Sequence, residues 1–255
     1  MDFTIKITGG QTFMLSEGQF DLIYNALSLG LAAMAATTVF MLVAQPRVLQ
    51  RYRLALVASA SVTFIAAYHY WRIFDSFKAA AAGTEVFNEA YRYVDWLLTV
   101  PLLLVEVIAV LALTKAVSSS LITRLVPASA AMIALGYPGE ISADDGTKIL
   151  WGVLSTIPFL YILYVLFVEL GKSLDRQPAG VAATVGRLRW LLLATWGVYP
   201  ISYLFPLLNI TGTDAFMYRQ IGYTVADVLA KCVFGLTIYK IAKMKSAAEG
   251  MSEDK

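Results

Sequence analysis

Residues 216–241 read FMYRQIGYTVADVLAKCVFGLTIYKI, a mostly apolar stretch long enough to cross a bilayer, with Lys231 near its middle. A charge at the bilayer centre costs about 2.5 to 3.5 kcal/mol even on the lenient scales, so it usually has a partner or a function. Asp227 lies four residues earlier, and on a helix this spacing places both side chains on one face. The pair is therefore a candidate functional site, with a bundle-stabilising salt bridge as the alternative.

The composition of the whole chain is that of a membrane protein. Of its 255 residues, 58% are hydrophobic and 15% are charged. A membrane-spanning helix needs about 20 apolar residues, and backbone groups in lipid must pair within the chain. We therefore predict an all-α fold, a bundle of seven transmembrane helices that forms a single domain over residues 1–255 and crosses the cell membrane repeatedly. The seven predicted helices span residues 20–44, 54–74, 87–113, 121–137, 149–170, 190–208 and 216–243.

The lysines and arginines near the helix ends predict the orientation. They concentrate after the first, third and fifth segments and in the tail, and such connections are typically cytoplasmic. We therefore expect residues 1–19 outside the cell and residues 244–255 as a cytoplasmic tail. The asymmetry explains the net charge of +2 without a nucleic-acid partner. The single cysteine, Cys232, excludes an internal disulfide and a cysteine cluster for metal. Prolines predict kinks in the third, fifth and sixth helices.

The third segment carries a second set of ionisable residues. Eleven residues, close to three helical turns, separate Asp95 from Glu106. Arg92 and Thr99 flank Asp95 at spacings of three and four, so all four side chains project from about the same side. The two carboxylates lie roughly 16 Å apart along the axis, at about 1.5 Å per residue. In the predicted orientation, Asp95 is nearer the outside and Glu106 is nearer the cytoplasm.

These positions are typical of a proton path across the membrane. Asp95 is the candidate proton acceptor outside Lys231, and Arg92 would keep it ionised until it is needed. Glu106 is the candidate donor on the inner side, because its apolar neighbours favour the protonated carboxyl. Simple ion pairs are the structural alternative, but two buried sets at comparable depth favour a function. His69 either hydrogen-bonds and modulates Asp95 or is an ordinary core histidine.

Two segments resemble the microbial rhodopsins. Residues 91–103, YRYVDWLLTVPLL, resemble the third helix of that family, and residues 227–231, DVLAK, resemble its retinal-binding lysine segment. The similarity covers essentially the whole chain, and the pattern Trp-x-x-Tyr-Pro at residues 196–200 fits the retinal pocket. By resemblance, the pocket residues are Trp96, Leu103, Met132, Gly136, Trp151, Ser155, Phe159, Trp196, Tyr199, Pro200 and Tyr203.

The resemblance implies that Lys231 forms a Schiff base with all-trans retinal and that Asp95 and Asp227 are its counterions. Light would then move a proton to Asp95, and Glu106 would supply the next one from the inside. The triplet Asp95, Thr99 and Glu106 resembles that of the proteorhodopsin and xanthorhodopsin pumps. The implied function is a light-driven outward proton pump, a transporter and not an enzyme.

Two other functions stay open from the sequence. A photosensory rhodopsin would signal to a partner protein, and such relatives commonly lack a carboxylic donor at position 106. A transporter without retinal would have no visible chromophore. The resemblance also implies a homo-oligomer, with a pentamer favoured.

Gly152 follows Trp151 where many relatives have a second large aromatic residue. By resemblance to the xanthorhodopsins, its missing side chain opens a lipid-facing window for a hydroxylated carotenoid antenna. Close helix packing is the alternative reason for the glycine. In addition, Arg219 stands where the archaeal pumps have an outer glutamate of a proton-release pair, so we do not expect release by that route.

Overall fold

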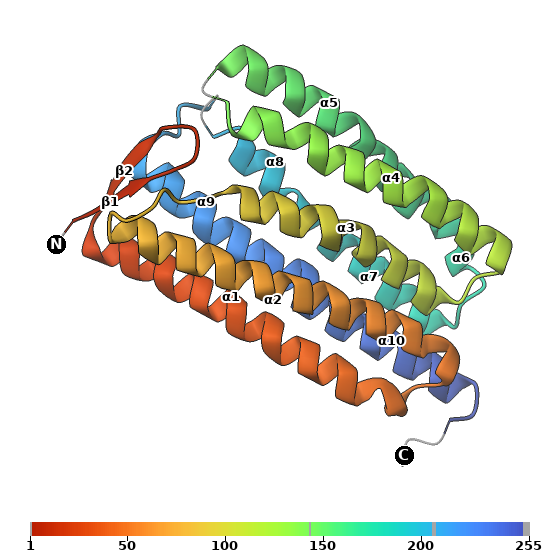
Figure 1. The fold of residues 1–255 in the computed structure, drawn as a ribbon. Helices are drawn as coiled ribbons and strands as arrows, with labels where there is room; N and C mark the ends of the chain where they lie inside the picture. Colours follow the sequence, from red (N-terminus) through yellow and green to blue (C-terminus); the bar gives the residue numbers. More distant parts are fainter. Residues whose placement is uncertain (1, 143, 206–207, 252–255) are drawn as a thin grey trace.

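The computed structural model describes residues 2–142, 144–205 and 208–251, which form a bundle of long, roughly aligned helices (Figure 1). Residues 206–207 of the predicted sixth helix and residues 252–255 of the tail lie outside the described residues. Within the described ranges, six helical stretches are long and apolar enough to cross a membrane. They are 17–47, 50–81, 90–111, 115–140, 145–174 and 212–248.

The individual elements confirm the predicted bundle and show where its helices change type. Short turns η1 (Gln45–Arg47) and η2 (Gln50–Tyr52) connect the first two helices, and two helices contain a π-helical turn. The elements that build the bundle are α1 (Glu17–Ala44), α2 (Arg53–Ala81), α3 (Ala90–Leu111), α4 (Lys115–Glu140), α5 (Asp145–Tyr164), η3 (Val165–Glu169), α6 (Gly171–Leu174), α7 (Ala179–Trp196), α8 (Val198–Tyr203), α9 (Gly212–Asp227), η5 (Val228–Val233) and α10 (Phe234–Ala248).

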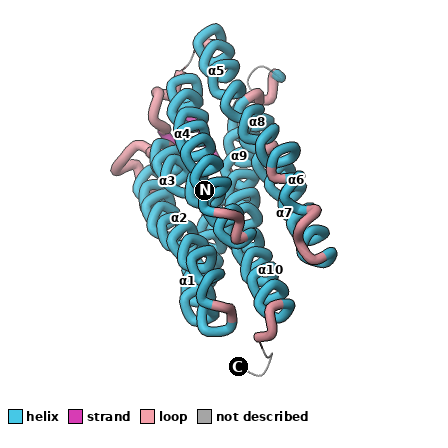
Figure 2. Tube along the Cα trace, turned by 90° about the vertical axis from the view of Figure 1, so that its right-hand side faces the viewer, coloured by secondary structure: helices cyan, strands magenta, loops and turns pink. Residues whose placement is uncertain are grey.

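Consecutive helices pack side by side from α1 to α5, and the last helix closes the bundle. The stretch from α9 to α10 packs against α1, α2 and α7, so the beginning and the end of the chain meet in the bundle. Figure 2 shows the same arrangement after a quarter turn, with α6, α7 and α8 on the side away from α1 and α2. The side chains of α3 and of the last helix therefore face one another in the interior.

The sixth predicted helix is divided at Gly197 into α7 and α8. Pro200 has no backbone N–H, so the carbonyl oxygen of Trp196 cannot receive the usual i to i+4 hydrogen bond. Gly197 itself keeps helical backbone angles, and its N–H still donates to Leu193 O at 2.9 Å, so the helical path continues past the missing hydrogen bond. Pro101 and Pro158 lie within the continuous helices α3 and α5.

A two-stranded antiparallel hairpin, which the sequence interpretation missed, precedes α1. Strands β1 (Phe3–Lys6) and β2 (Thr12–Leu15) pair with Phe3 opposite Leu15, and an isolated parallel bridge joins Ile7 to Phe87. Alternating apolar residues around Gly9 and Gly10 were the available signal. The hairpin packs over one end of the bundle, where Phe13 stacks on Phe216 with ring centroids 4.7 Å apart. We call this the hairpin end and the opposite one the tail end.

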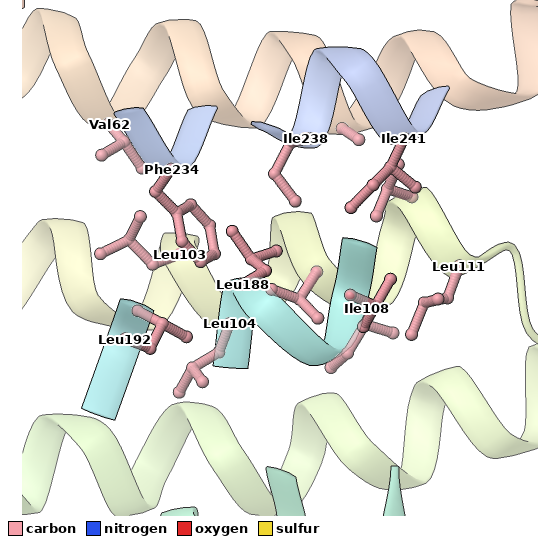
Figure 3. Packing of buried hydrophobic residues seen from close by; sticks show 14 of the residues in the cluster. Val62, Leu103, Leu104, Ile108, Leu111, Leu188, Leu192, Phe234, Ile238 and Ile241 are labelled. Carbon is pink, nitrogen blue, oxygen red and sulfur yellow. The ribbon is translucent and has the colours of Figure 1, made fainter. Parts of the chain in front are cut away.

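The half of the bundle toward the tail end is filled with aliphatic side chains. Figure 3 shows them meeting from α2, α3, α7 and α10, with Leu104 and Ile108 facing Leu188 and Leu192. These side chains are almost completely buried. The close packing separates the centre of the bundle from the tail end. Most of the buried charged side chains lie between the centre and the hairpin end, with Glu106 and Lys245 on the tail-end side.

Candidate functional site

Lys231 lies at the centre of the bundle between two carboxylates. It belongs to the π-helical turn η5, a feature that often marks functional sites in helices. Its ammonium Nζ donates hydrogen bonds to Asp95 Oδ2 and to Asp227 Oδ1, the latter at 2.9 Å. All three side chains are no more than 2% exposed. Lys231 and Asp227 of the last helix are therefore in direct contact with Asp95 of α3, the predicted proton acceptor.

Asp227 is the more extensively hydrogen-bonded of the two carboxylates. Tyr199 and Trp96 donate to its Oδ1 at 2.8 and 3.2 Å, and Tyr70 donates to its Oδ2 at 2.8 Å. The guanidinium of Arg92 lies 3.7 Å from the same Oδ2 atom. Donors on a carboxylate stabilise its ionised form. Asp227 is thus held as a fixed negative charge beside Lys231.

One carboxylate oxygen of Asp95, Oδ2, accepts a hydrogen bond from Lys231. The other, Oδ1, has no hydrogen-bond partner in the described structure. Thr99, which the sequence places in phase with it, donates to the backbone oxygen of Asp95 at 2.8 Å and not to the carboxylate. His69 lies beside Asp95, with Nδ1 3.8 Å from Oδ1, but that nitrogen donates to the backbone oxygen of Ile65 at 2.9 Å. The ring is close to Asp95 without a hydrogen bond to it.

Arg92 differs from the expectation that it acts on Asp95. Its guanidinium donates to Gln220 Oε1 at 2.9 Å and to the Tyr70 hydroxyl at 3.4 Å, and its nearest carboxylate is that of Asp227. The reason is geometric, because Arg92 lies one turn nearer the hairpin end than Asp95. Arg92 therefore connects the central site with polar groups toward that end.

Glu106 is fully buried on the tail-end side of Lys231. Neither of its carboxyl oxygens has a hydrogen-bond partner among the described residues. Ser59 of α2 is the polar side chain beside it, and the surrounding positions belong to the aliphatic core. A charge in such a place would be poorly solvated, so the neutral, protonated acid is the form that these surroundings accommodate.

A cavity of about 400 Å³ extends from this charged centre between α3, α4, α5 and the α7–α8 helix. Its volume is in the range of cofactor pockets. Trp96 and Tyr199 line the cavity and also donate to Asp227, so the cavity adjoins the Lys231 site. The structure places ten predicted pocket residues in its wall: Trp96, Met132, Gly136, Gly152, Ser155, Phe159, Trp196, Tyr199, Pro200 and Tyr203.

Two predicted pocket residues do not line this cavity. Leu103 is packed in the aliphatic core, on the side where Phe234 lies in Figure 3. Trp151 instead packs toward α4, where its Cβ would lie 3.1 Å from a Cβ added at Gly139. The sequence pattern gave their helical positions but not the direction of their side chains.

Tyr203 inserts its ring between α4 and α5. Its hydroxyl donates to the backbone oxygen of Lys148 at 2.7 Å. A Cβ added at Gly139 would lie 1.8 Å from that hydroxyl, and one added at Gly152 would lie 3.0 Å from the ring. Both glycines therefore make room for Tyr203, which gives Gly152 a packing role as well as a place in the cavity wall.

Sequence reasoning missed a group of polar residues at the hairpin end. Arg219 pairs with Glu89 and Glu140, and Gln220 lies between Arg92 and Glu89. Glu89 lies at the start of the predicted third helix and Glu140 lies just beyond the predicted fourth, so both are near helix ends, where charged residues are common. Arg219 and Gln220 could have been noticed in the sequence, because two polar residues interrupt an apolar stretch there. Their partners come from other helices and could not be predicted.

The chain matches the family model described as bacteriorhodopsin-like protein over residues 22–244. Among curated relatives, a green-light absorbing proteorhodopsin from Gamma-proteobacterium EBAC31A08 is 32% identical over 242 residues. That alignment covers 92% of this chain and 94% of the proteorhodopsin.

Two solved structures resemble this one closely. Xanthorhodopsin, described as a light-driven ion pump with dual chromophore, is 48% identical with a TM-score of 0.89. A thermophilic rhodopsin is 46% identical with the same TM-score. Each comparison covers 93% of this chain and 98% of the other.

Proposed function

Because this chain belongs to the bacteriorhodopsin-like family, whose members include light-driven ion pumps, we propose that it is an outward proton pump driven by light. The family and the spanning helices make it a multi-pass membrane protein. We further propose that the hairpin end faces the outside and the tail end the cytoplasm, as the distribution of positive charge predicts.

The residues around the cavity suit retinal bound covalently to Lys231. The wall is largely aromatic and apolar, as a polyene requires, and Lys231 provides an amine at the charged centre next to it. When bound, retinal would supply the absorption of visible light and an isomerisation that changes the surroundings of the Lys231 nitrogen. Trp96, Trp196 and Tyr199 would hold it by packing, and Met132, Ser155 and Phe159 would line its far part.

The difference between the two central aspartates carries the proposal. Asp227 already accepts hydrogen bonds from Tyr70, Trp96 and Tyr199, so it stays ionised and balances the positive charge of Lys231. Asp95 has an oxygen without a partner and can take a proton. The Lys231 nitrogen therefore gives its proton to Asp95, on the side toward the hairpin end.

Glu106 returns the proton from the other side. It is isolated from water by the aliphatic core, so its carboxyl keeps its proton until the Lys231 nitrogen lacks one. The closed packing shown in Figure 3 also prevents the nitrogen from exchanging freely with the cytoplasm. A proton thus enters from the tail end and leaves toward the hairpin end.

A carotenoid antenna is a second proposal for the same cavity. Gly152 lines the cavity, and its neighbours Ile149 and Val153 are 51% and 58% exposed on the outer surface of α5. An apolar, elongated molecule could therefore lie against α5 near the proposed retinal site. In Gly152→Trp we expect loss of carotenoid-sensitised transport while retinal stays bound. Sensitisation that persists in this variant would rule out the window.

Liposomes containing the purified protein and all-trans retinal test the transported ion. We expect a light-induced pH change that a protonophore collapses and that persists when sodium and chloride are replaced by larger, impermeant ions. Lys231→Ala should show neither colour nor pH change. A light response that requires sodium or chloride would contradict proton transport.

A further inference from the structure

A buried ion cluster at the hairpin end joins three helices. Arg219 of α9 donates to both oxygens of Glu89, at 2.8 and 3.1 Å, and to Glu140 Oε1 at 3.2 Å. Glu89 immediately precedes α3, and Glu140 is the last residue of α4. The three side chains are at most 16% exposed. The cluster lies outside the proposed proton path from Glu106 through Lys231 to Asp95.

The two glutamates are not equivalent. Glu89 accepts two hydrogen bonds from Arg219 and a third from Gln220 Nε2 at 2.9 Å. Glu140 accepts one from Arg219 at 3.2 Å and one from the Tyr93 hydroxyl at 3.4 Å. Because donors stabilise the ionised carboxylate, the negative charge is better held at Glu89. Glu140 is thus the carboxyl that can carry a proton.

Other titratable groups face Glu140 from the neighbouring helices. Lys148 of α5 contributes a positive charge, without an ion pair to Glu140 in the described structure. Tyr203 of α8 and Tyr223 of α9 contribute phenols. None of these three donates a hydrogen bond to Glu140 among the described contacts, so Arg219 and Tyr93 are its direct donors.

The cluster is connected to the central site through side chains. Tyr70 donates to Asp227 at 2.8 Å and accepts from Arg92 at 3.4 Å. Arg92 donates to Gln220 Oε1 at 2.9 Å, and Gln220 in turn donates to Glu89. A change of charge at the centre is therefore transmitted to the cluster through buried groups, where Coulomb interactions are stronger than in water.

We propose that Glu140 is the proton-release group of this protein. This inference rests on the proposed pump function. When the Lys231 nitrogen passes its proton to Asp95, positive charge moves toward the hairpin end. The Glu140 O–H bond then breaks, its proton goes to water outside, and Arg219 and Tyr93, which already donate to Glu140, stabilise the carboxylate left behind. Asp95 later gives up the proton that restores Glu140.

Proton release after a light flash tests the proposal, with the retinal-loaded protein in nanodiscs and a pH-sensitive dye in the water. In the wild type we expect the dye to report release together with the transfer from Lys231 to Asp95. In Glu140→Gln, release should be delayed until Asp95 loses its proton at the end of the cycle. Glu85→Gln removes an exposed carboxylate of the α2–α3 connection and should keep the wild-type timing.

A second variant changes the protonation of Glu140 while leaving its side chain in place, so that loss of release cannot be ascribed to misfolding of Glu140→Gln. In Glu89→Gln, Arg219 loses its charged partner and turns to Glu140, which is then ionised before the flash. Early release should again be absent, and the infrared band of a carboxyl group that loses its proton, assigned through Glu140→Gln, should be missing.

Unchanged early release in Glu140→Gln would overturn the release group while leaving the pump proposal intact. Proton release only at the end of the cycle in the wild type would also overturn the assignment of Glu140 as the release group. Absence of any light-induced proton movement in the wild type would overturn both proposals.

Discussion

At the scale of single residues, Asp95 and Asp227 differ in their surroundings. Both contact Lys231, but three further side chains donate to Asp227, whereas one oxygen of Asp95 is without a partner. In Asp95→Asn the proton of the Lys231 nitrogen has no acceptor. The amount of the transient state with a deprotonated nitrogen should therefore fall by roughly 10²-fold or more. Flash spectroscopy measures this, with the exposed Asp145→Asn as control. A normal transient in Asp95→Asn would contradict the assignment.

Glu106 gives a second prediction at this scale. Glu106→Gln keeps the shape of the side chain but removes its proton, so the Lys231 nitrogen must wait for a proton from bulk water. Its reprotonation should slow by roughly 10²-fold, and the rate should fall with rising pH in proportion to proton concentration. In the wild type the internal donor should keep the rate nearly independent of pH. A photocycle unchanged by this substitution would refute the donor role.

At the scale of secondary-structure elements, hydrophobic length was enough to predict the helices but not their irregularities. The sequence predicted the apolar segments, and spacing within one helix predicted the common side of Asp95 and Glu106. The π-helical turn at Lys231 has no comparable local signal in the sequence, whereas the division at Gly197 follows from Pro200, three residues later. The hairpin was missed because its short alternation of apolar residues is weak beside the long helical segments.

The junction of α8 with α4 and α5 provides a prediction about stability. Ala at position 139 would place its Cβ 1.8 Å from the Tyr203 hydroxyl, so the ring would have to move and lose its hydrogen bond to Lys148. We expect Gly139→Ala to lower the free energy of unfolding by about 1–3 kcal/mol. Thermal denaturation followed by loss of the visible absorption measures this.

A matched substitution separates this packing effect from the general effect of alanine in a helix. A Cβ at Gly186 of α7 meets nothing within 4 Å. Gly186→Ala should therefore be neutral or stabilising by up to about 1 kcal/mol. Equal effects of the two substitutions would show that contact with Tyr203 does not determine stability at position 139.

At the scale of the whole molecule, the helices are arranged so that polar groups connect the centre with the hairpin end and aliphatic groups fill the tail end. The residues that form this contrast come from different helices. Glu89, Glu140 and Tyr70 could not be assigned to the site from the sequence, because the contacts depend on how the helices are rotated against one another. Charge and helical spacing were enough to identify Lys231, Asp95 and Glu106 as candidates, and the resemblance to a known family gave them their implied roles.

The orientation of the bundle decides the direction of transport. We expect a protease-sensitive tag after residue 255 to be cut only in opened cells, because positive charge places the tail end in the cytoplasm. A matching tag before residue 1 should be cut in cells whose outer surface is accessible. Cleavage in the opposite pattern would reverse the predicted direction of proton transport.

The most direct test of the central claim is the pH of an unbuffered suspension of intact cells that contain the protein and retinal. We predict that light acidifies the medium and that a protonophore abolishes the change, as do Lys231→Ala and Asp95→Asn. A coloured protein that leaves the medium unchanged, or makes it alkaline, would contradict an outward proton pump.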